Sequence, residues 1–466
     1  MSSGLVRNTV AAVASLVSLL GLANGHPSPV LNGVTTLTDR VMVHDTLAAH
    51  YVPMQQHVPP QHEDQHLRRR GLSSSNLTNV HDIYYIIELT VGNEKINVSV
   101  DTGSSDTWLV QQPYTCVSYY YPPPEKLDCG LGGGLKGNLS GGLIPDLVFG
   151  RAYTDGTFVQ GYFGYEDVTI GGLTAKHQQL AIVNYTYWFG DGRISGLLGL
   201  AYPLMTSLDG SSVAQKPYDP VFFTLWKNKL VAPLFSVALS RAQDQFTPPD
   251  NSPSGGALTD THDTSYLAFG GLPPVSIDET SWARAPIQLM SLLGDSDDFK
   301  TQERGLYIII ADAWVYGKTN HTVGTNGTRN VPSPVLSETL TKNTTQFPVL
   351  IDVGSSLSVL PRKLVEAVYA SFDPPAKYMS ENGLFYALCN ATVPTFGVQI
   401  GNSTFYMAPE DLLRQSAKDS TGQYCRIGIT DAEYGPYVLG VTFLTNVVAV
   451  FDIGNTEMRF ASRTRY

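Results

Sequence analysis

Two short stretches of the chain place an aspartate after a run of apolar residues and before a glycine and two serines. One is Asp101–Ser105, with the sequence Asp-Thr-Gly-Ser-Ser, and the other is Asp352–Ser356, with the sequence Asp-Val-Gly-Ser-Ser. In each, the glycine allows close approach of the backbone, and a serine hydroxyl can donate a hydrogen bond to the carboxylate. Two such loops facing each other predict a pair of carboxyl groups that share one proton.

A shared proton makes one carboxyl group an acid and the other a base. Such a pair can hold one water molecule between Asp101 and Asp352, activate it and protonate a carbonyl group, without a metal ion, a cofactor or a covalent intermediate. A single Asp-x-Gly stretch is more often a turn or a helix cap. The second copy, which also follows an apolar strand, favours the catalytic interpretation.

A second motif is repeated in the same order in both halves of the chain. The step Leu197-Leu198-Gly199 follows the first aspartate motif, and Val438-Leu439-Gly440 follows the second at a similar spacing. Two ordered motifs at similar spacing are much less easily explained by chance than one. The sequence therefore predicts two duplicated lobes related by a pseudo-twofold axis, with one aspartate loop contributed by each lobe.

The elements that position these loops are predicted to be strands, with few helices. Apolar residues are concentrated over Ile83–Val91 and alternate with polar ones over Ile96–Val100, and Gly92–Glu94 between them predicts a turn. The second of these strands would deliver Asp101 at its end. Helical spacing of apolar residues is seen at Pro361–Phe372, and a shorter helix is predicted at Pro409–Ser416.

These motifs together resemble those of the pepsin-like aspartic endopeptidases, of the fungal secreted type. The first motif extends to Trp108, as in the family, and residues 153–157 (Tyr-Thr-Asp-Gly-Thr) are similar to the family's flap tip, a hairpin that closes over substrate. Val450–Asp452 resembles the family's C-terminal strand. The resemblance covers about residues 84–461 and implies an all-β, bilobal fold with a cleft between the lobes.

The resemblance also implies the organisation of the chain and a role for each matching residue. The lobe with the first aspartate and the flap would span 71–273, and the second lobe would span 274–466. Asp101 and Asp352 would be catalytic, and the Tyr153 hydroxyl would face the indole N–H of Trp108. The substrate-binding residues would be Gly103, Ser104, Tyr153, Asp155, Gly156, Thr157, Gly354 and Ser355. Two disulfides are implied, Cys116–Cys129 and Cys389–Cys425.

The chain departs from the family pattern at Val353, where the family usually has threonine. In the family the two motif threonines brace the opposite loops by hydrogen bonds. Here Thr102 can brace one way and Val353 cannot brace back, a loss of about 0.5–1.5 kcal/mol for one hydrogen bond. The departure leaves an alternative function open, that of a catalytically impaired binding protein with the same fold. A glycan-binding or adhesive protein would leave the paired motifs unexplained.

Asp155, at the predicted flap tip, has two interpretations. Its carboxylate can face a cationic side chain of the substrate, because in fungal relatives an aspartate here accompanies tolerance of lysine before the scissile bond. It can equally stabilise the hairpin tip as an Asx-type turn. The sequence leaves both open.

The N-terminal 70 residues are predicted to precede the fold. Residues 1–25 have the form of a signal peptide, with Arg7 before an apolar stretch that is too short to span a bilayer. Residues 26–70 are predicted to be a pro-segment that inhibits the enzyme intramolecularly and ends at the tribasic Arg68–Arg70. The segment holds six of the ten histidines, which would make its charge depend on pH near 6.5. The alternatives are a buried helix for the first segment and, for the second, a disordered arm with histidines of no special role.

Composition narrows the class of protein and its compartment. The 466 residues carry a net charge of −11, which opposes binding to nucleic acid, and the four cysteines show no zinc-binding spacing. A polar C-terminus and no second long apolar stretch predict no stable membrane anchor. Nine Asn-x-Ser/Thr sequons predict a secreted, extracellular glycoprotein, or alternatively a vacuolar one, and monomer is the family default. The sequons are at Asn76, Asn97, Asn138, Asn184, Asn320, Asn326, Asn343, Asn390 and Asn402.

Overall fold

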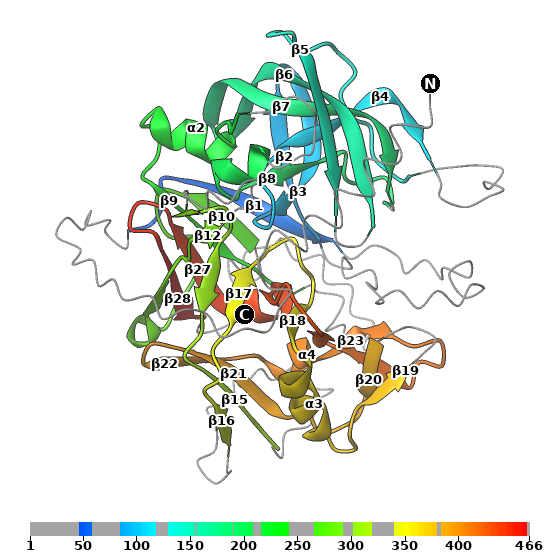
Figure 1. Cartoon of the computed structure of the whole chain (residues 1–466), viewed down its shortest axis with the longest axis vertical. Coiled ribbons are helices and arrows are strands. Elements are labelled where there is room, and N and C mark those ends of the chain that lie inside the picture. Colours follow the sequence, from blue (N-terminus) through cyan, green and yellow to red (C-terminus); the bar gives the residue numbers. More distant parts are fainter. Residues whose placement is uncertain are drawn as a thin grey trace, which may run out of the picture.

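The chain consists mostly of β-strands arranged in two lobes (Figure 1). The computed structural model describes residues 46–57, 84–117, 129–153, 156–188, 190–207, 216–241, 265–291, 302–318, 340–379 and 384–463. Within these residues the predicted all-β, bilobal fold class is confirmed. The predicted signal peptide and residues 26–45 and 58–70 of the predicted pro-segment lie outside the described residues.

One long sheet runs through the first lobe and into the second. In sheet order its strands are β11 (Ala283–Pro286), β28 (Glu457–Ser462), β27 (Val447–Asp452), β9 (Leu234–Ala238), β10 (Ser265–Phe269), β1 (His50–His57), β2 (Tyr84–Val91), β3 (Glu94–Asp101), β8 (Gly196–Gly199), β4 (Trp108–Cys116), β7 (Leu173–Tyr187), β6 (Phe158–Ile170) and β5 (Leu143–Ala152). Phe451 of β27 lies opposite Phe235 of β9, and their rings stack with centroids 4.5 Å apart. The two halves of the chain are therefore joined by a continuous ladder of backbone hydrogen bonds.

The second lobe adds three sheets of its own and a small hairpin. The five-stranded sheet has the order β14 (Ile308–Ile310), β17 (Pro348–Ile351), β26 (Val438–Leu439), β18 (Ser358–Pro361) and β25 (Ile429–Ala432). The two four-stranded sheets are β16 (Thr341–Asn343), β15 (Ala313–Gly317), β21 (Thr395–Ile400), β22 (Ser403–Tyr406), and β19 (Lys377–Met379), β20 (Leu384–Leu388), β24 (Tyr424–Ile427), β23 (Leu413–Lys418). The hairpin pairs β12 (Met290–Ser291) with β13 (Gln302–Glu303).

Each aspartate loop follows a strand that lies parallel to an apolar-Gly strand. In the first lobe Asp101 of β3 lies opposite Gly199 of β8, and in the second Ile351 of β17 lies opposite Leu439 of β26. The two repeated motifs of the sequence are thus neighbours in space in both lobes. The predicted strands and the turn at Gly92, which has φ +58°, are also confirmed.

The helices agree with the sequence patterns in part. The predicted helix at 361–372 is confirmed as α3 (Arg362–Ala370), which buries its apolar face. The prediction for 409–416 is wrong in its second half, because α4 (Pro409–Leu412) ends where β23 begins and Leu413 pairs with Ile427. Two short helices with largely apolar sequences, α2 (Val221–Lys227) and α5 (Val441–Leu444), had no periodic signal to reveal them.

Part of the predicted pro-segment is a strand of the long sheet. β1 pairs antiparallel with β10, with His50 opposite Phe269, and then with β2, with Gln55 opposite Ile86. In Figure 1 this blue strand lies between the N-terminal lobe and the strands that continue into the second lobe. Sequence reasoning did not anticipate that residues of this segment belong to the sheet.

Candidate active site

The two aspartate loops have matching hydrogen bonds. Asp101 and Asp352 are each 7% exposed. The backbone N–H of Gly103 donates to Asp101 Oδ1 at 2.8 Å, and that of Gly354 donates to Asp352 Oδ1 at 2.9 Å. The hydroxyl of Ser104 donates to Asp101 Oδ2, and that of Ser355 donates to Asp352 Oδ2 at 2.9 Å. Each carboxylate is therefore held by a backbone amide and a serine hydroxyl from its own loop.

The glycines of the motifs let the loops face each other. A Cβ atom on Gly103 would lie 2.9 Å from Asp352 Oδ2, closer than any side chain tolerates, and one on Gly354 would overlap the carboxylate of Asp101. Each glycine thus touches the aspartate of the opposite lobe. The structure brings the two predicted carboxyl groups together at the junction of the lobes.

The environment of the pair favours retention of a proton. Burial and, next in size, the negative charge of Asp352 raise the pKa of Asp101 to about 7. The hydrogen bonds from Ser104 and Gly103 stabilise the charged form and oppose this shift. Asp101 therefore keeps its proton over the acidic range and lies beside a second carboxyl group, which is the arrangement that acid–base chemistry needs.

Of the two second residues in the motifs, only Thr102 has a hydroxyl that forms hydrogen bonds to the opposite loop, as the valine at position 353 leads one to expect. The Thr102 hydroxyl donates to the Ile351 carbonyl at 3.1 Å and accepts from the Val353 N–H at 3.0 Å. Val353 itself is 1% exposed and is part of the apolar core. The loops are thus joined across the lobe junction from the Thr102 side alone at this pair of positions.

The predicted flap residues that the structure describes form a closed hairpin end. The Tyr153 N–H donates to the Thr157 carbonyl at 2.8 Å, and the Gly156 N–H donates to the Tyr153 carbonyl at 3.0 Å. Gly156 has φ +87°, a conformation that favours glycine. Residues 154 and 155 lie outside the described residues, so the role of Asp155 stays a prediction.

Tyr153 is fixed to the first aspartate loop as predicted. The indole N–H of Trp108 donates to the Tyr153 hydroxyl at 2.7 Å. Burial raises the pKa of Tyr153, and the charge of Asp101 raises it further, so the phenol keeps its proton. The influence of Asp101 on Tyr153 also indicates that the flap tyrosine lies near the carboxyl pair.

Sequence reasoning missed three side chains that support the flap. Trp188 packs edge-on against Trp108 and Tyr153, with ring centroids 5.3 Å and 5.5 Å away. Arg151, on β5 two residues before Tyr153, donates through Nε to Asp106 Oδ2 at 2.7 Å. Asp106 lies inside the first aspartate motif, so its place in the sequence could have identified it as part of the site. Nothing local in the sequence marks Arg151 or Trp188.

Both implied disulfides are present. Cys116 is bonded to Cys129 and Cys389 to Cys425, with Cα atoms 5.6 Å and 4.8 Å apart. The first closes the loop that follows β4, and the second joins the end of β20 to β24. Neither reaches the aspartate loops, so their role is to stabilise the individual lobes.

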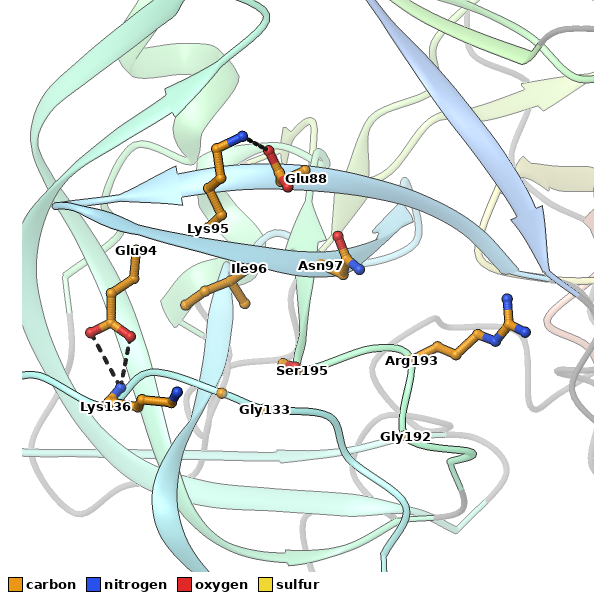
Figure 2. Close-up of a pocket in the computed structure, with 11 residues that line it drawn as sticks. Glu88, Glu94, Lys95, Ile96, Asn97, Gly133, Lys136, Gly192, Arg193 and Ser195 are labelled. Carbon is orange, nitrogen blue, oxygen red and sulfur yellow. Dashed lines mark hydrogen bonds and ion pairs between the residues drawn. The ribbon is translucent and has the colours of Figure 1, made fainter. Parts of the chain in front are cut away.

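A separate hollow of about 390 Å³ lies on the first lobe, beside the β2–β3 hairpin (Figure 2). Its lining is mostly polar, and both of its carboxylates have partners within the protein. Lys95 pairs with Glu88 at 2.7 Å, and the Glu94 carboxylate accepts from the backbone N–H of Lys136 at 3.1 Å. Asn97, the asparagine of a predicted glycosylation sequon, also lines this hollow. None of its lining residues belongs to the aspartate loops.

In the part of the chain that the structure describes, no cluster of three or more histidine, cysteine, aspartate or glutamate side chains has the arrangement of a metal site. No helix within the same residues has both the length and the apolar character to cross a membrane.

Two duplicated lobes, each contributing one buried aspartate loop beneath a flap, define the class of bilobal hydrolases that work with a carboxyl pair. The family model described as eukaryotic aspartyl protease matches residues 84–248 and 320–463. The chain belongs to this family and is an aspartic-type endopeptidase.

Known relatives agree with this assignment. A protein of Aspergillus fumigatus, described as a probable aspartic-type endopeptidase, is 32% identical over 399 residues, which are 84% of this chain and 81% of the relative. Barrierpepsin of Saccharomyces cerevisiae is 26% identical, with 82% of this chain and 60% of the relative covered. Rhizopuspepsin-3 of Rhizopus niveus is 25% identical, with 83% of each chain covered.

Proposed function

We propose that the chain hydrolyses peptide bonds of extended polypeptides in acid, through a water molecule held by Asp101 and Asp352. The observation that carries this proposal is the buried carboxyl pair with matched hydrogen bonds from both loops. The raised pKa of Asp101, about 7, favours a protonated acid beside a second carboxyl group over the acidic range.

In the proposed mechanism the carboxylate of Asp352 takes a proton from the water as its oxygen bonds to the peptide carbonyl carbon. The protonated carboxyl group of Asp101 donates its proton to the carbonyl oxygen, which gives a neutral tetrahedral diol. The Asp352 carboxyl group then protonates the amide nitrogen while the Asp101 carboxylate takes a proton from a diol hydroxyl, so that the C–N bond breaks and an amine and a carboxylic acid are released. Tyr153 and Trp108 exclude water above the pair, and the residues Gly103, Ser104, Gly156, Thr157, Gly354 and Ser355 line the path of the substrate.

The rival function, binding without catalysis, rests on Val353. Against it, both serine-to-aspartate hydrogen bonds and the Thr102 brace are present in this chain. Cleavage of denatured globin at about pH 4, where one carboxyl of such a pair holds its proton, tests the proposal. We expect cleavage that pepstatin inhibits. A purified mature chain that binds pepstatin but leaves globin uncut would favour the binding protein instead.

We further propose that the enzyme is secreted as a glycosylated, monomeric zymogen. Of the sequon asparagines, Asn97, Asn138, Asn390 and Asn402 are exposed, Asn184 and Asn343 are partly buried, and Asn76, Asn320 and Asn326 lie outside the described residues. Exposure supports the first four as glycosylation sites. Mass spectrometry of the secreted protein before and after deglycosylation tests each site, and an unmodified Asn390 or Asn402 would count against the assignment.

The proposed pro-segment is supported by the contacts of β1 with the body of the enzyme. The ring Nε2 of His57, at the end of this strand, contacts the carboxylate of Asp191, and the two side chains are only 8% and 11% exposed. Tyr84 of β2 lies opposite His57, and Arg193 donates from its backbone to Asp191 at 3.3 Å.

The predicted histidine switch would hold the segment most firmly in mild acid, and the contact with Asp191 makes His57 the histidine best placed to contribute. His57→Gln should shift the pH midpoint of zymogen activation, measured by appearance of the mature chain on gels. His50→Gln is the matched control, because His50 is only partly buried and contacts a backbone carbonyl, that of Gly171, at 3.3 Å. An unchanged midpoint in a variant with all six histidines of residues 26–70 replaced would leave carboxylate protonation alone as the trigger.

A further inference from the structure

Two side-chain hydrogen bonds join the flap strand to the first aspartate loop, and they lie two residues apart on both segments. Tyr153 accepts a hydrogen bond from Trp108 at 2.7 Å, and two residues earlier on both segments Arg151 donates to Asp106 at 2.7 Å. Side chains two residues apart on an extended segment point to the same side. The flap stem and the aspartate loop therefore face each other through two consecutive side-chain pairs.

The Arg151–Asp106 pair is buried and has additional partners. The side chains are 15% and 3% exposed. Arg151 also donates to the carbonyls of Gly150 at 2.9 Å and Thr206 at 3.1 Å, and its guanidinium lies 5.5 Å from the centre of the Phe149 ring. A planar guanidinium with several fixed acceptors has one favoured geometry, which makes it suited to hold a strand in place.

Asp106 is equally constrained on its own side. Its second oxygen, Oδ1, accepts from the Tyr218 hydroxyl at 2.6 Å. The preceding residue, Ser105, donates from its hydroxyl to the Tyr202 carbonyl at 2.7 Å, and Asp101 lies only five residues before Asp106. A displacement of Asp106 would thus be transmitted to the loop that carries a member of the carboxyl pair.

We propose that Arg151 and Asp106 are positioning residues. Together with the Trp108–Tyr153 hydrogen bond, they fix the distance between the flap and the carboxyl pair. This inference rests on the proposed function of the Asp101–Asp352 site. Neither side chain takes part in proton transfer. Their effect is to keep Tyr153 placed over the bound substrate, so that its peptide bond stays aligned with the carboxyl pair.

The test is a double-mutant cycle with Arg151→Met, Asp106→Asn and the double variant. Each single change should lower kcat/KM by about tenfold to a hundredfold, mainly through KM, and speed the dissociation of pepstatin by a similar factor, because the flap closes over both ligands. The double variant should be no worse than the more impaired single variant, since the lost interaction is shared. Arg151→Lys, which keeps the charge, should restore part of the effect.

Two controls separate positioning from general stability. Val168→Ala removes buried volume from β6 away from the flap end and should lower Tm without changing KM or the pepstatin dissociation rate. Lys176→Met breaks an exposed ion pair with Asp167 in the same lobe and should change none of these quantities.

The outcomes distinguish this inference from the proposed function. If wild-type enzyme cleaves globin but the Arg151 and Asp106 variants lose only Tm, with KM and pepstatin dissociation as in Val168→Ala, the positioning role is wrong. Additive single effects in the cycle would also contradict it. If the wild-type enzyme itself does not cleave, the proposed function has failed, and pepstatin dissociation still measures the flap.

Discussion

The loops that carry Asp101 and Asp352 have the same hydrogen bonds around their carboxylates and a different second residue. Thr102 makes two bonds across the lobe junction, to the carbonyl of Ile351 and from the N–H of Val353, whereas Val353 offers only an apolar side chain in return. Each carboxylate nonetheless accepts from a glycine N–H and a serine hydroxyl of its own loop, and Asp352 also lies 3.4 Å from the Thr102 hydroxyl. The comparison indicates that a glycine and a serine are enough to orient Asp101, and that Thr102 serves to join the lobes.

The largest expected effect comes from removing either member of the pair. Asp101→Asn and Asp352→Asn should each reduce turnover of a peptide substrate by about a hundredfold or more, because the base or the acid is lost. Circular dichroism should show an intact fold, since asparagine keeps the size of the side chain. Turnover of either variant above a few per cent of wild type would contradict the two-carboxylate mechanism.

The pair should also make stability depend on pH. The native pKa of Asp101 is raised to about 7, whereas an unfolded aspartate titrates near 3.9. Between these values the native state binds more protons than the unfolded state, so the free energy of unfolding falls as pH rises, by a few kcal/mol in order of magnitude. Asp101→Asn removes this dependence.

Thermal unfolding at about pH 4 and about pH 7, the two ends of this window, measures the effect. The Tm of Asp101→Asn relative to wild type should rise between the two values. Asp146→Asn, at an exposed position of β5, is the control and should follow wild type. A constant difference between Asp101→Asn and wild type at both values would disprove the linkage.

The brace on the Thr102 side gives the next effect in size. Thr102→Val should destabilise the enzyme by about 2–3 kcal/mol, because it leaves the buried N–H of Val353 without its hydroxyl acceptor and the Ile351 carbonyl without this donor. Urea unfolding at the pH of maximum stability measures the change. A loss below about 0.5 kcal/mol, less than one typical hydrogen bond, would show that the lobes are joined mainly elsewhere.

The smallest effect on stability should come from giving the second loop a threonine hydroxyl as well. Val353→Thr should raise the free energy of unfolding by about 0.5–1.5 kcal/mol, the value of one net hydrogen bond, with unchanged substrate preference. The double variant Thr102→Val/Val353→Thr moves the single threonine hydroxyl from the Asp101 loop to the Asp352 loop. A clear loss of stability in Val353→Thr would mean that the new hydroxyl finds no acceptor at this buried position.

The parts of the site that sequence could predict are those encoded by short repeated patterns. Asp101, Asp352 and their glycines stand at the ends of apolar strands, and the duplication of these motifs indicates that the two loops meet. Arg151 escaped prediction because an arginine near a strand end is ordinarily exposed, and its partner Asp106 lies 45 residues away. The sequence of residues 50–57 is polar and carries two histidines, which predicts a segment outside the fold. Such a sequence gives no sign of the pairing with β2 and β10 that the structure shows.

The pairing of β27 with β9 has a consequence for synthesis of the chain. The sheet of the first lobe is completed by strands near residue 450, so its backbone ladder cannot close until almost the entire chain has left the ribosome. Domains that depend on contacts so distant in sequence fold slowly and expose unpaired edges in the meantime. The nascent N-terminal half must therefore stay incompletely paired until synthesis is almost finished, and during this time chaperones rather than its own core would protect it from aggregation.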